Sequence, residues 1–277
     1  MKFCSDIISS RSNPLVKWAT SLSEKKYRDA EGAFLVEGEK LSFEALEAGL
    51  PVIRVFVEEG KKAGLLPRLE RFYEDKRYEK TVITLLSESA FSKISSEKSP
   101  QGIIIAIKYL DFFSKLDIIY KEEFFLKPSE RAIILCSIRD PGNLGSVIRS
   151  AVAFGTEHII LSADCVDLYN SKTIRAAMGS LFKIKATVVS DMTACINAAR
   201  AQGRRVFAAE LRQNAVPISD INPCSSDIVV IGNEGHGIPE DVSFACTGSI
   251  YIPISENTES LNASVAAGVL MWEFSKK

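Results

Sequence analysis

Three short segments of the chain combine glycines with side chains that can bind or orient a polar substrate. Each lies where an apolar, strand-like run gives way to a helix-like pattern, and they are residues 140–151 (DPGNLGSVIRSA), 231–242 (IGNEGHGIPEDV) and 252–268 (IPISENTESLNASVAAG). In open α/β folds, ligands bind at the carboxyl ends of the strands. The three segments therefore predict one composite site of the kind that carries chemistry.

The first segment supplies an amide and a guanidinium. After the Asp-Pro-Gly turn, the spacing predicts a helix from about Asn143, with Leu144, Val147 and Ile148 on its buried stripe. Asn143 and Arg149 lie off that stripe and would project from the carboxyl end of the preceding strand. On this segment alone, an Asn that caps the helix and an Arg in solvent explain the pattern as well as a functional role does.

The second segment is rich in glycine. Gly232, Gly235 and Gly237 surround Asn233 and Glu234, and glycines let a backbone approach a ligand closely. The pattern is neither a P-loop nor the G-x-G-x-x-G dinucleotide fingerprint. That absence disfavours a nucleotide-dependent oxidoreductase on a Rossmann-like sheet, while an ordinary glycine-rich turn stays open.

The third segment places polar side chains at the start of the last predicted helix, which runs to about Phe274. Ser260 and Asn262 fall in its first turn, where unpaired backbone N–H groups and the helix dipole also point. These residues either cap the helix or serve a ligand, and this segment alone does not decide between the two.

Composition describes an ordinary globular protein whose charge is nearly balanced. The 277 residues include 34 Lys and Arg against 35 Asp and Glu, a net charge of -1, so binding to nucleic acid must come from a local patch. Residues 11–28 hold such a patch, with Glu24 as the only acidic residue. Its basic residues are Arg11, Lys17, Lys25, Lys26 and Arg28. They suit phosphate contacts, or else form a solvated helix face.

Metal sites and membrane segments are not predicted. The six cysteines are scattered and the two histidines lie far apart, so the spacing of zinc ligands is missing and no metal is expected. No apolar run approaches the roughly 18 residues that span a bilayer. The first residues lack the apolar core of a signal peptide, and we therefore expect a cytoplasmic protein.

The hydrophobic pattern predicts an α/β fold in two domains. In residues 1–110, it predicts strands at 33–37, 52–57, 81–86 and 101–109 and helices at 13–24, 39–49, 61–76 and 87–94. Residues 111–129 change character and are predicted to be a linker or a bridging helix. From 130 to 277, helices alternate with apolar runs, which is typical of a parallel sheet. These predicted strands are 131–137, 157–161, 183–189, 205–209, 227–231 and 249–253.

Taken together, in this order and spacing, the three segments resemble the signature motifs of the SpoU (TrmH-type) RNA ribose methyltransferases. D-P-G-N-L-G-S-V-I-R-S-A matches the first motif, I-G-N-E-G-H-G the second and E-S-L-N-A-S-V-A the third. The resemblance covers residues 131–277. The N-terminal region is similar to the family's RNA substrate-binding domain in residues 8–17 (ISSRSNPLVK), 25–28 (KKYR) and 34–38 (FLVEG).

The resemblance implies a fold and a cofactor that the residue pattern alone does not show. The family belongs to the SPOUT class, whose C-terminal parallel sheet is tied in a deep trefoil knot. Its S-adenosyl-L-methionine is bound in that knot largely by backbone groups, and members usually form homodimers whose sites borrow surface from both subunits. The implied cofactor positions here are Gly232, Ile252 and Leu261, with Asn233 and Ile254 beside them.

The implied reaction moves a methyl group from the sulfonium to a ribose 2′-OH. Arg149 matches the arginine that the family assigns to activating this hydroxyl. A guanidinium loses its proton only far above neutral pH, so we expect Arg149 to bind the adjacent phosphate while that phosphate or water takes the proton. Asn143 and Glu234 are expected to orient Arg149, and Ser260 and Asn262 to complete the pocket.

The expected substrate is ribosomal RNA, because the appended domain resembles those of rRNA-directed members. Transfer RNA is the alternative substrate. A non-catalytic RNA-binding protein that kept the fold is the alternative class, against which the intact polar residues of the three motifs argue.

Overall fold

The computed structural model describes residues 1–116 and 126–276, which divide into two compact units. The first unit consists of residues 1–110 together with Tyr169–Arg175, and the second of the other described residues. Each unit is built on its own β-sheet. Within the described residues, no helix is both long and apolar enough to cross a membrane.

The first unit contains a five-stranded mixed sheet in the order β1-β4-β3-β5-β2. Its strands are β1 (Lys2–Ile8), β2 (Ala33–Glu37), β3 (Val52–Glu58), β4 (Val82–Leu86) and β5 (Ile103–Lys108). Its helices are α1 (Pro14–Ser21), α2 (Lys25–Glu31), α3 (Glu39–Glu47), α4 (Lys62–Leu69) and α5 (Glu88–Ile94), with 3-10 turns η1 (Glu59–Lys61), η2 (Glu70–Phe72) and η3 (Lys76–Tyr78). Strand β5 runs antiparallel to β2 and β3, whereas β4 is parallel to β3 and β1.

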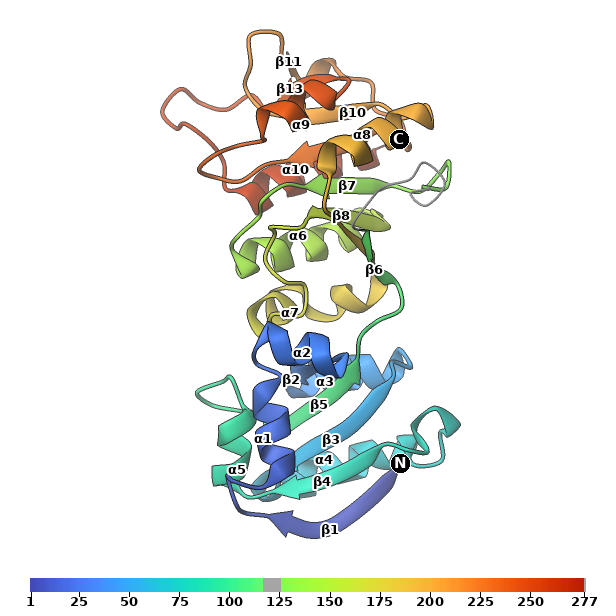
Figure 1. Ribbon diagram of the computed structural model, residues 1–277, viewed down its shortest axis with the longest axis vertical. Coiled ribbons are helices and arrows are strands. Elements are labelled where there is room, and N and C mark those ends of the chain that lie inside the picture. Colours follow the sequence, from blue (N-terminus) through green and yellow to red (C-terminus); the bar gives the residue numbers. More distant parts are fainter. Residues whose placement is uncertain (117–125, 277) are drawn as a thin grey trace. The chain divides into compact units, whose positions relative to one another are not determined.

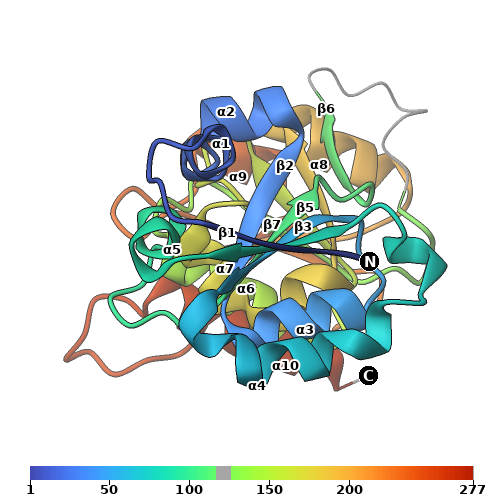
Figure 2. The same cartoon turned by 90° about the horizontal axis from the view of Figure 1, so that it is seen from below.

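Helices cover both faces of this sheet. Figure 2 shows α1 and α5 on one side of the strands and α3 and α4 on the other. On the α1 and α5 side, Val16 and Phe91 pack against Phe56 and Ile104 in a fully buried cluster. Burial of such side chains is worth about 1.5–3 kcal/mol each relative to exposure, which is enough to hold short helices in place.

The second unit contains an eight-stranded sheet in which every pair of neighbouring strands is parallel. The order is β11-β13-β10-β12-β7-β8-β9-β6. The strands are β6 (Phe113–Leu116), β7 (Ala132–Leu135), β8 (His158–Ser162), β9 (Lys185–Val189), β10 (Val206–Ala209), β11 (Val216–Pro217), β12 (Ile228–Ile231) and β13 (Gly248–Tyr251). The predicted α/β class with a parallel C-terminal sheet is therefore confirmed.

Helices pack against both faces of this sheet, whose strands lie one above another in Figure 1. The helices of this unit are α6 (Pro141–Ala153), α7 (Ser171–Ala177, shared with the first unit), α8 (Met192–Ala201), α9 (Glu240–Ala245) and α10 (Ala263–Ser275), with 3-10 segments η4 (Met178–Lys183) and η5 (Ile218–Asp220). Ile134 and Val230 pack with Ile196 of α8 and Val242 of α9. On the other face, Phe207 meets Phe274 of α10 edge to face.

Part of the segment predicted to be a linker or a bridging helix is a strand instead. Phe113–Leu116 form β6, which pairs in parallel with β9 at one edge of the sheet. Residues 117–125 of the same prediction lie outside the described residues. The predicted start of the first-motif helix is also corrected, because α6 begins at Pro141 and the Asp140 carboxylate caps it by accepting from the Asn143 amide at 2.8 Å.

Candidate active site

The three polar segments meet at one edge of the second sheet. The first follows β7, the second follows β12, and the third follows β13. Strand β12 lies beside β7, and β10 separates it from β13. Because all these strands are parallel, their carboxyl ends share an edge, as the sequence predicts.

Side chains from all three segments form one hydrogen-bonded chain. Asn143 donates from Nδ2 to Oε1 of Glu234, and Asn262 donates from Nδ2 to Oδ1 of Asn143 at 3.0 Å. An amide can donate and accept at the same time, so Asn143 connects a carboxylate from one loop to an amide from another. The predicted grouping of these three residues is observed.

Asn262 also caps α10. Its Oδ1 accepts from the backbone N–H groups of Ser264 at 3.0 Å and of Val265 at 3.4 Å, and from the Ser264 hydroxyl at 2.6 Å. The capping role is therefore observed, and it leaves the side-chain nitrogen of Asn262 free to join the network. Its oxygen holds the helix and its nitrogen reaches Asn143.

A cavity of about 310 Å³ lies beside this network. Its lining includes every position expected for the cofactor: Gly232, Asn233, Ile252, Ile254 and Leu261. Glu234 and Ser260 also line it. Sequence reasoning missed further lining residues at or just after the carboxyl ends of β10 and β13, namely Ala209, Glu210, Leu211 and Tyr251. The β10 turn carries no glycine or motif that marks it as part of a site.

One wall of the cavity depends on a close backbone crossing. A Cβ atom placed on Gly232 would lie 2.4 Å from the carbonyl carbon of Gly237 and 2.6 Å from the amide nitrogen of Ile238. Both neighbours are backbone atoms, which cannot rotate away. Glycine at position 232 is therefore required by the fold of this loop.

Asn233 organises the loop that carries Glu234. Its Oδ1 accepts from the amides of Gly235 at 2.8 Å and His236 at 3.1 Å, and its Nδ2 donates to the Ser137 carbonyl at 2.9 Å. The side-chain hydrogen-bonding groups of Asn233 are thus used within the protein. Its contribution to the cavity wall is mainly one of shape.

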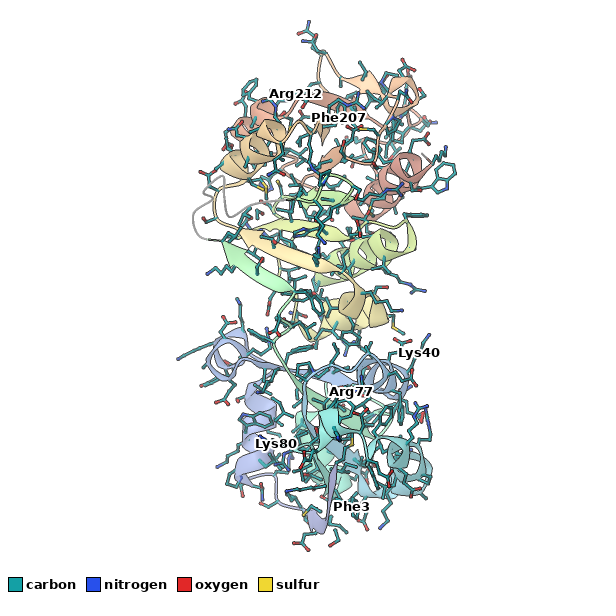
Figure 3. All side chains as sticks on the ribbon, turned by 90° about the vertical axis from the view of Figure 1, so that its right-hand side faces the viewer. Phe3, Lys40, Arg77, Lys80, Phe207 and Arg212 are labelled. Atoms are coloured by element: carbon teal, nitrogen blue, oxygen red, sulfur yellow. The ribbon has the colours of Figure 1, made fainter. Side chains whose placement is uncertain are left out.

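The missed wall after β10 has its own supports. Glu210 accepts at Oε1 from the hydroxyls of Ser243 and of Ser249, the latter at 2.8 Å, and pairs with Arg212 at 3.0 Å. The Arg212 guanidinium lies 5.2 Å from the centre of the Phe244 ring. Figure 3 labels Arg212 at the surface of this unit. These contacts fix the turn that carries Leu211.

Arg149 lies outside the network. It is exposed on α6, and within residues 1–116 and 126–276 it makes no hydrogen bond or ion pair. Six residues along an α-helix turn a side chain about 120° away from the starting direction, so Arg149 and Asn143 do not point the same way. The structure thus does not bring Arg149 to Asn143 and Glu234 within one chain.

Four of the five basic residues expected to meet RNA are exposed on the first unit. Arg11 and Lys17 lie before and within α1, and Lys25 and Lys26 begin α2. The expectation for Arg28 is corrected. Its side chain is only 4% exposed, and its guanidinium donates to the carbonyls of Leu22 and Ser23 at 2.9 and 2.7 Å, so Arg28 fastens the turn between the two helices.

The cavity lining fits the cofactor that the motifs imply. Apolar side chains such as Ile231, Ile252 and Leu270 suit an adenine ring, while Glu210 and Glu234 are the charged side chains among its lining residues. Glu210 is paired with Arg212, whereas Glu234 has no ion pair within the described residues, and such a carboxylate favours a cationic ligand, which a sulfonium is. The volume lies at the low end of the range for small-molecule sites. In the described part of the chain, no group of three or more His, Cys, Asp and Glu side chains is placed to bind a metal ion.

Comparison with known proteins agrees with this geometry. A model of the SpoU rRNA Methylase family matches residues 130–272, and one of the MRM3-like substrate binding domain matches residues 13–105. The chain is 30% identical over 265 residues to the Bacillus subtilis 23S rRNA (guanosine(2553)-2′-O)-methyltransferase RlmP, covering 96% of this chain and 97% of that one.

Two further relatives extend the comparison. The 23S rRNA (uridine(2479)-2′-O)-methyltransferase of Streptomyces viridochromogenes is 27% identical over 270 residues, which cover 96% of this chain and 90% of the relative. The crystal structure of an AdoMet-bound rRNA methyltransferase from Sinorhizobium meliloti matches with a TM-score of 0.82 at 27% identity, over 97% of each chain.

The parallel sheet, the cavity at its carboxyl edge and these likenesses define an S-adenosylmethionine-dependent RNA 2′-O-methyltransferase. The chain belongs to the SpoU rRNA methylase family and carries an N-terminal MRM3-like substrate binding domain. Family membership implies the trefoil knot that the sequence motifs led us to expect.

Proposed function

We propose that this protein methylates one ribose 2′-OH in 23S ribosomal RNA and that the Asn143, Glu234 and Asn262 network shapes the acceptor side of the site. The observation that carries the proposal is that this network borders the cavity that holds the expected cofactor positions. The names of the two curated relatives support 23S rRNA as the substrate, and because they modify different nucleotides they leave the target base open.

The proposed division of labour follows from the geometry. S-adenosylmethionine, when bound, supplies the methyl group on a sulfonium. The cofactor would be held by the backbones of Gly232 and Leu261 and by the part of the cavity wall that Ile252 forms. Ser260 and Glu234 line the same cavity. Methyl transfer needs oxygen, carbon and sulfur nearly in line, so positioning supplies a large part of the acceleration. The fixed network presents its polar atoms without reorganisation during the reaction.

Arg149 is proposed to bind the phosphate next to the acceptor ribose and to orient the hydroxyl. Arg149 is exposed and has no partner among the described residues, which leaves its guanidinium available for a bidentate phosphate contact. The proton of the 2′-OH then passes to that phosphate or to water.

A homodimer would explain why Arg149 does not contact the Asn143, Glu234 and Asn262 network of its own chain. Val265, Val269 and Trp272 on α10 are exposed, and with Ser146 and Ser150 of α6 they line an open groove. An exposed apolar strip of this kind fits a second copy of the chain. We propose that Arg149, on the helix that borders this groove, serves the site of the partner copy.

The first unit is proposed to bind the RNA around the target. Arg11, Lys17, Lys25 and Lys26 are exposed there, and the family model that covers the three lysines describes a substrate binding domain. Lys25 is partly committed to Asp29, at 3.0 Å, so we expect the other three cations to contribute most to phosphate binding.

The test is to map 2′-O-methyl groups in total RNA from cells with and without the gene, and to restore the site in vitro with purified protein and S-adenosylmethionine. One 23S position is expected to lose its methyl group and to regain it. A lost mark in transfer RNA, or no lost mark, would reject the proposed substrate.

Arg149 provides the matched test of mechanism. Arg149→Ala is expected to lower kcat at least about 100-fold, because the phosphate contact and the hydroxyl orientation are lost together. Arg149→Lys keeps the positive charge but cannot make the bidentate contact of a guanidinium, so its kcat is also expected to be strongly reduced. Normal methyl transfer by Arg149→Ala, or near-normal transfer by Arg149→Lys, would contradict this role.

A further inference from the structure

The residue that follows β7 and Cys136 has an unusual backbone. Ser137 has a φ of 56°, in the left-handed region that side chains with a Cβ rarely adopt. The residue lies between the strand and the first-motif helix α6. Such a conformation persists only when the surrounding structure holds it.

The loop after β8 supplies that hold. The Ser137 amide donates to the Ser162 hydroxyl at 2.8 Å, and the Ser137 hydroxyl donates to Oδ2 of Asp164 at 2.7 Å. Asp164 is itself fixed, because its Oδ1 accepts from the Ser162 hydroxyl at 2.5 Å and its Oδ2 accepts from Arg139 at 2.7 Å. One carboxylate therefore collects donors from both sides of the turn.

The carbonyl of Ser137 connects this turn to the candidate active site. This carbonyl accepts from Nδ2 of Asn233 at 2.9 Å, and Asn233 Oδ1 accepts from the amides of Gly235 and His236. Glu234 lies between the residues held in this way and reaches Asn143. A change in the Ser137 peptide would therefore move the loop that carries Glu234.

Asp164 is suited to this task at neutral pH. Burial acts to raise the pKa of its carboxyl, but hydrogen bonds from Ser162, Ser137 and Arg139 lower that pKa below its ordinary value overall. The carboxylate is ionised and can only accept hydrogen bonds, which is what the three donors require.

We propose that Asp164 is a positioning residue for methyl transfer, which holds Ser137 in its left-handed conformation and thereby keeps Glu234 beside Asn143. Asp164 acts through Ser137 and Asn233 and does not itself line the cavity. The inference rests on the proposed role of Glu234.

The test compares Asp164→Ala with Ser137→Gly and with the double variant. Glycine adopts positive φ without a side-chain penalty, so a glycine at position 137 no longer needs the hold from Asp164. Asp164→Ala alone is expected to lower kcat about tenfold while KM for S-adenosylmethionine stays within about twofold, because small misplacement at a site is costly. Adding Ser137→Gly is expected to restore most of that loss. Asp220→Ala, at an exposed position, is the matched control.

A second readout separates the loop from the chemistry. Hydrogen exchange at the Gly235 and His236 amides is expected to quicken about tenfold in Asp164→Ala and to return toward the native rate in the double variant, because local opening frees these hydrogen bonds. Unchanged exchange, or an Asp164→Ala defect that Ser137→Gly does not relieve, would overturn the positioning role. Faster exchange with normal methyl transfer would support the structural linkage but reject the proposed role of Glu234.

Discussion

At the scale of single residues, the cavity depends most directly on Gly232. Gly232→Ala is expected to weaken S-adenosylmethionine binding at least about tenfold, because its Cβ would overlap the Gly237 and Ile238 backbone and displace the cavity wall. Isothermal titration calorimetry measures this directly. Gly235→Ala is the control, since its Cβ would meet only the Asn233 side chain at 3.4 Å. If the two variants bound S-adenosylmethionine with equal affinity, the close backbone crossing at Gly232 would not be the cause of the weaker binding.

The ionised Asp227 side chain is a buried, paired carboxylate whose contribution to stability can be tested. Its fully buried carboxylate accepts from Arg205 at 2.9 and 2.6 Å and from the Cys224 amide at 2.8 Å. Burial acts to raise its pKa, and these hydrogen bonds lower that pKa below the ordinary value of 3.8 overall. A pKa lowered by folding stabilises the protein above about 3.8, and this contribution is lost as pH falls through the folded pKa.

Asp227→Asn is therefore expected to reduce the free energy of unfolding at pH 7 by about 2–3 kcal/mol, since a charge-assisted pair is lost and Arg205 loses its partner. Urea unfolding at pH 7 and pH 3 measures the effect, and the difference from the native protein should shrink at the lower pH. Asp220→Asn should change little at either pH. A deficit that is the same at both pH values would argue against ionisation as its source.

Sequence reasoning found the residues that meet at strand ends and missed those whose role depends on tertiary contacts. Asn143, Glu234 and Asn262 could be grouped because each follows a predicted parallel strand. Arg28 was misassigned because a run of basic residues does not show which one faces the core. The sequence around Asp164 does not indicate a role for this residue, because its partners Ser137 and Arg139 lie on another loop.

At the scale of elements, the start of α10 combines a helix cap with the site, and two substitutions separate these roles. Asn262→Asp keeps an oxygen for the Ser264 and Val265 amides but loses the donor to Asn143. It is expected to retain the melting temperature within a few degrees while kcat falls about tenfold or more. Asn262→Ala is expected to lose activity and also about 1 kcal/mol of stability.

Thermal unfolding and single-turnover methylation measure the two effects separately. If Asn262→Asp retained full activity, the bond to Asn143 would have no catalytic role.

The predicted elements were those with apolar runs, and the missed ones lie at edges. Strands β7 and β12 are buried throughout, and β5 is buried except at Lys108, so the buried parts of these strands are continuous in Ile, Leu, Val and Ala. In contrast, β1 and β6 are edge strands with mostly exposed side chains and no clear periodicity. The pairing of β6 with β9 depends on backbone hydrogen bonds that the sequence pattern does not reveal.

At the scale of the whole molecule, the proposed homodimer makes a prediction about one helix face. Trp272 is 50% exposed on α10, and Trp272→Glu is expected to convert the dimer to a monomer, because a charge cannot be buried in an apolar interface without a partner. Methyl transfer should fall with it, since Arg149 would lose the partner site.

Size-exclusion chromatography with light scattering measures the mass. The control is Phe244→Glu, at a residue that is 70% exposed on α9 and so tests whether any exposed aromatic gives the same effect. A native protein that is monomeric, or a Trp272→Glu variant that is still dimeric, would contradict the proposed interface.

Two features of the whole molecule were beyond the residue pattern. The knot is implied only by family membership, because periodicity reports which residues are buried and not how the chain threads. The second such feature is that Tyr169–Arg175 belong to the first unit. The composition of a short segment within one domain does not indicate that the segment packs with another domain.

The position of α10 has a consequence for how cofactor and subunit association depend on each other. Ala263, Ala266 and Leu270 line the cavity, while Val265, Val269 and Trp272 of the same 13-residue helix line the open groove. In the proposed homodimer, this one helix would contact both the cofactor and the partner copy, and would thereby couple the two binding equilibria. If S-adenosylmethionine changes the affinity of the dimer by some factor, dimer formation must change the affinity for S-adenosylmethionine by the same factor. Measuring the dimer dissociation constant with and without S-adenosylmethionine gives the sign and size of this coupling.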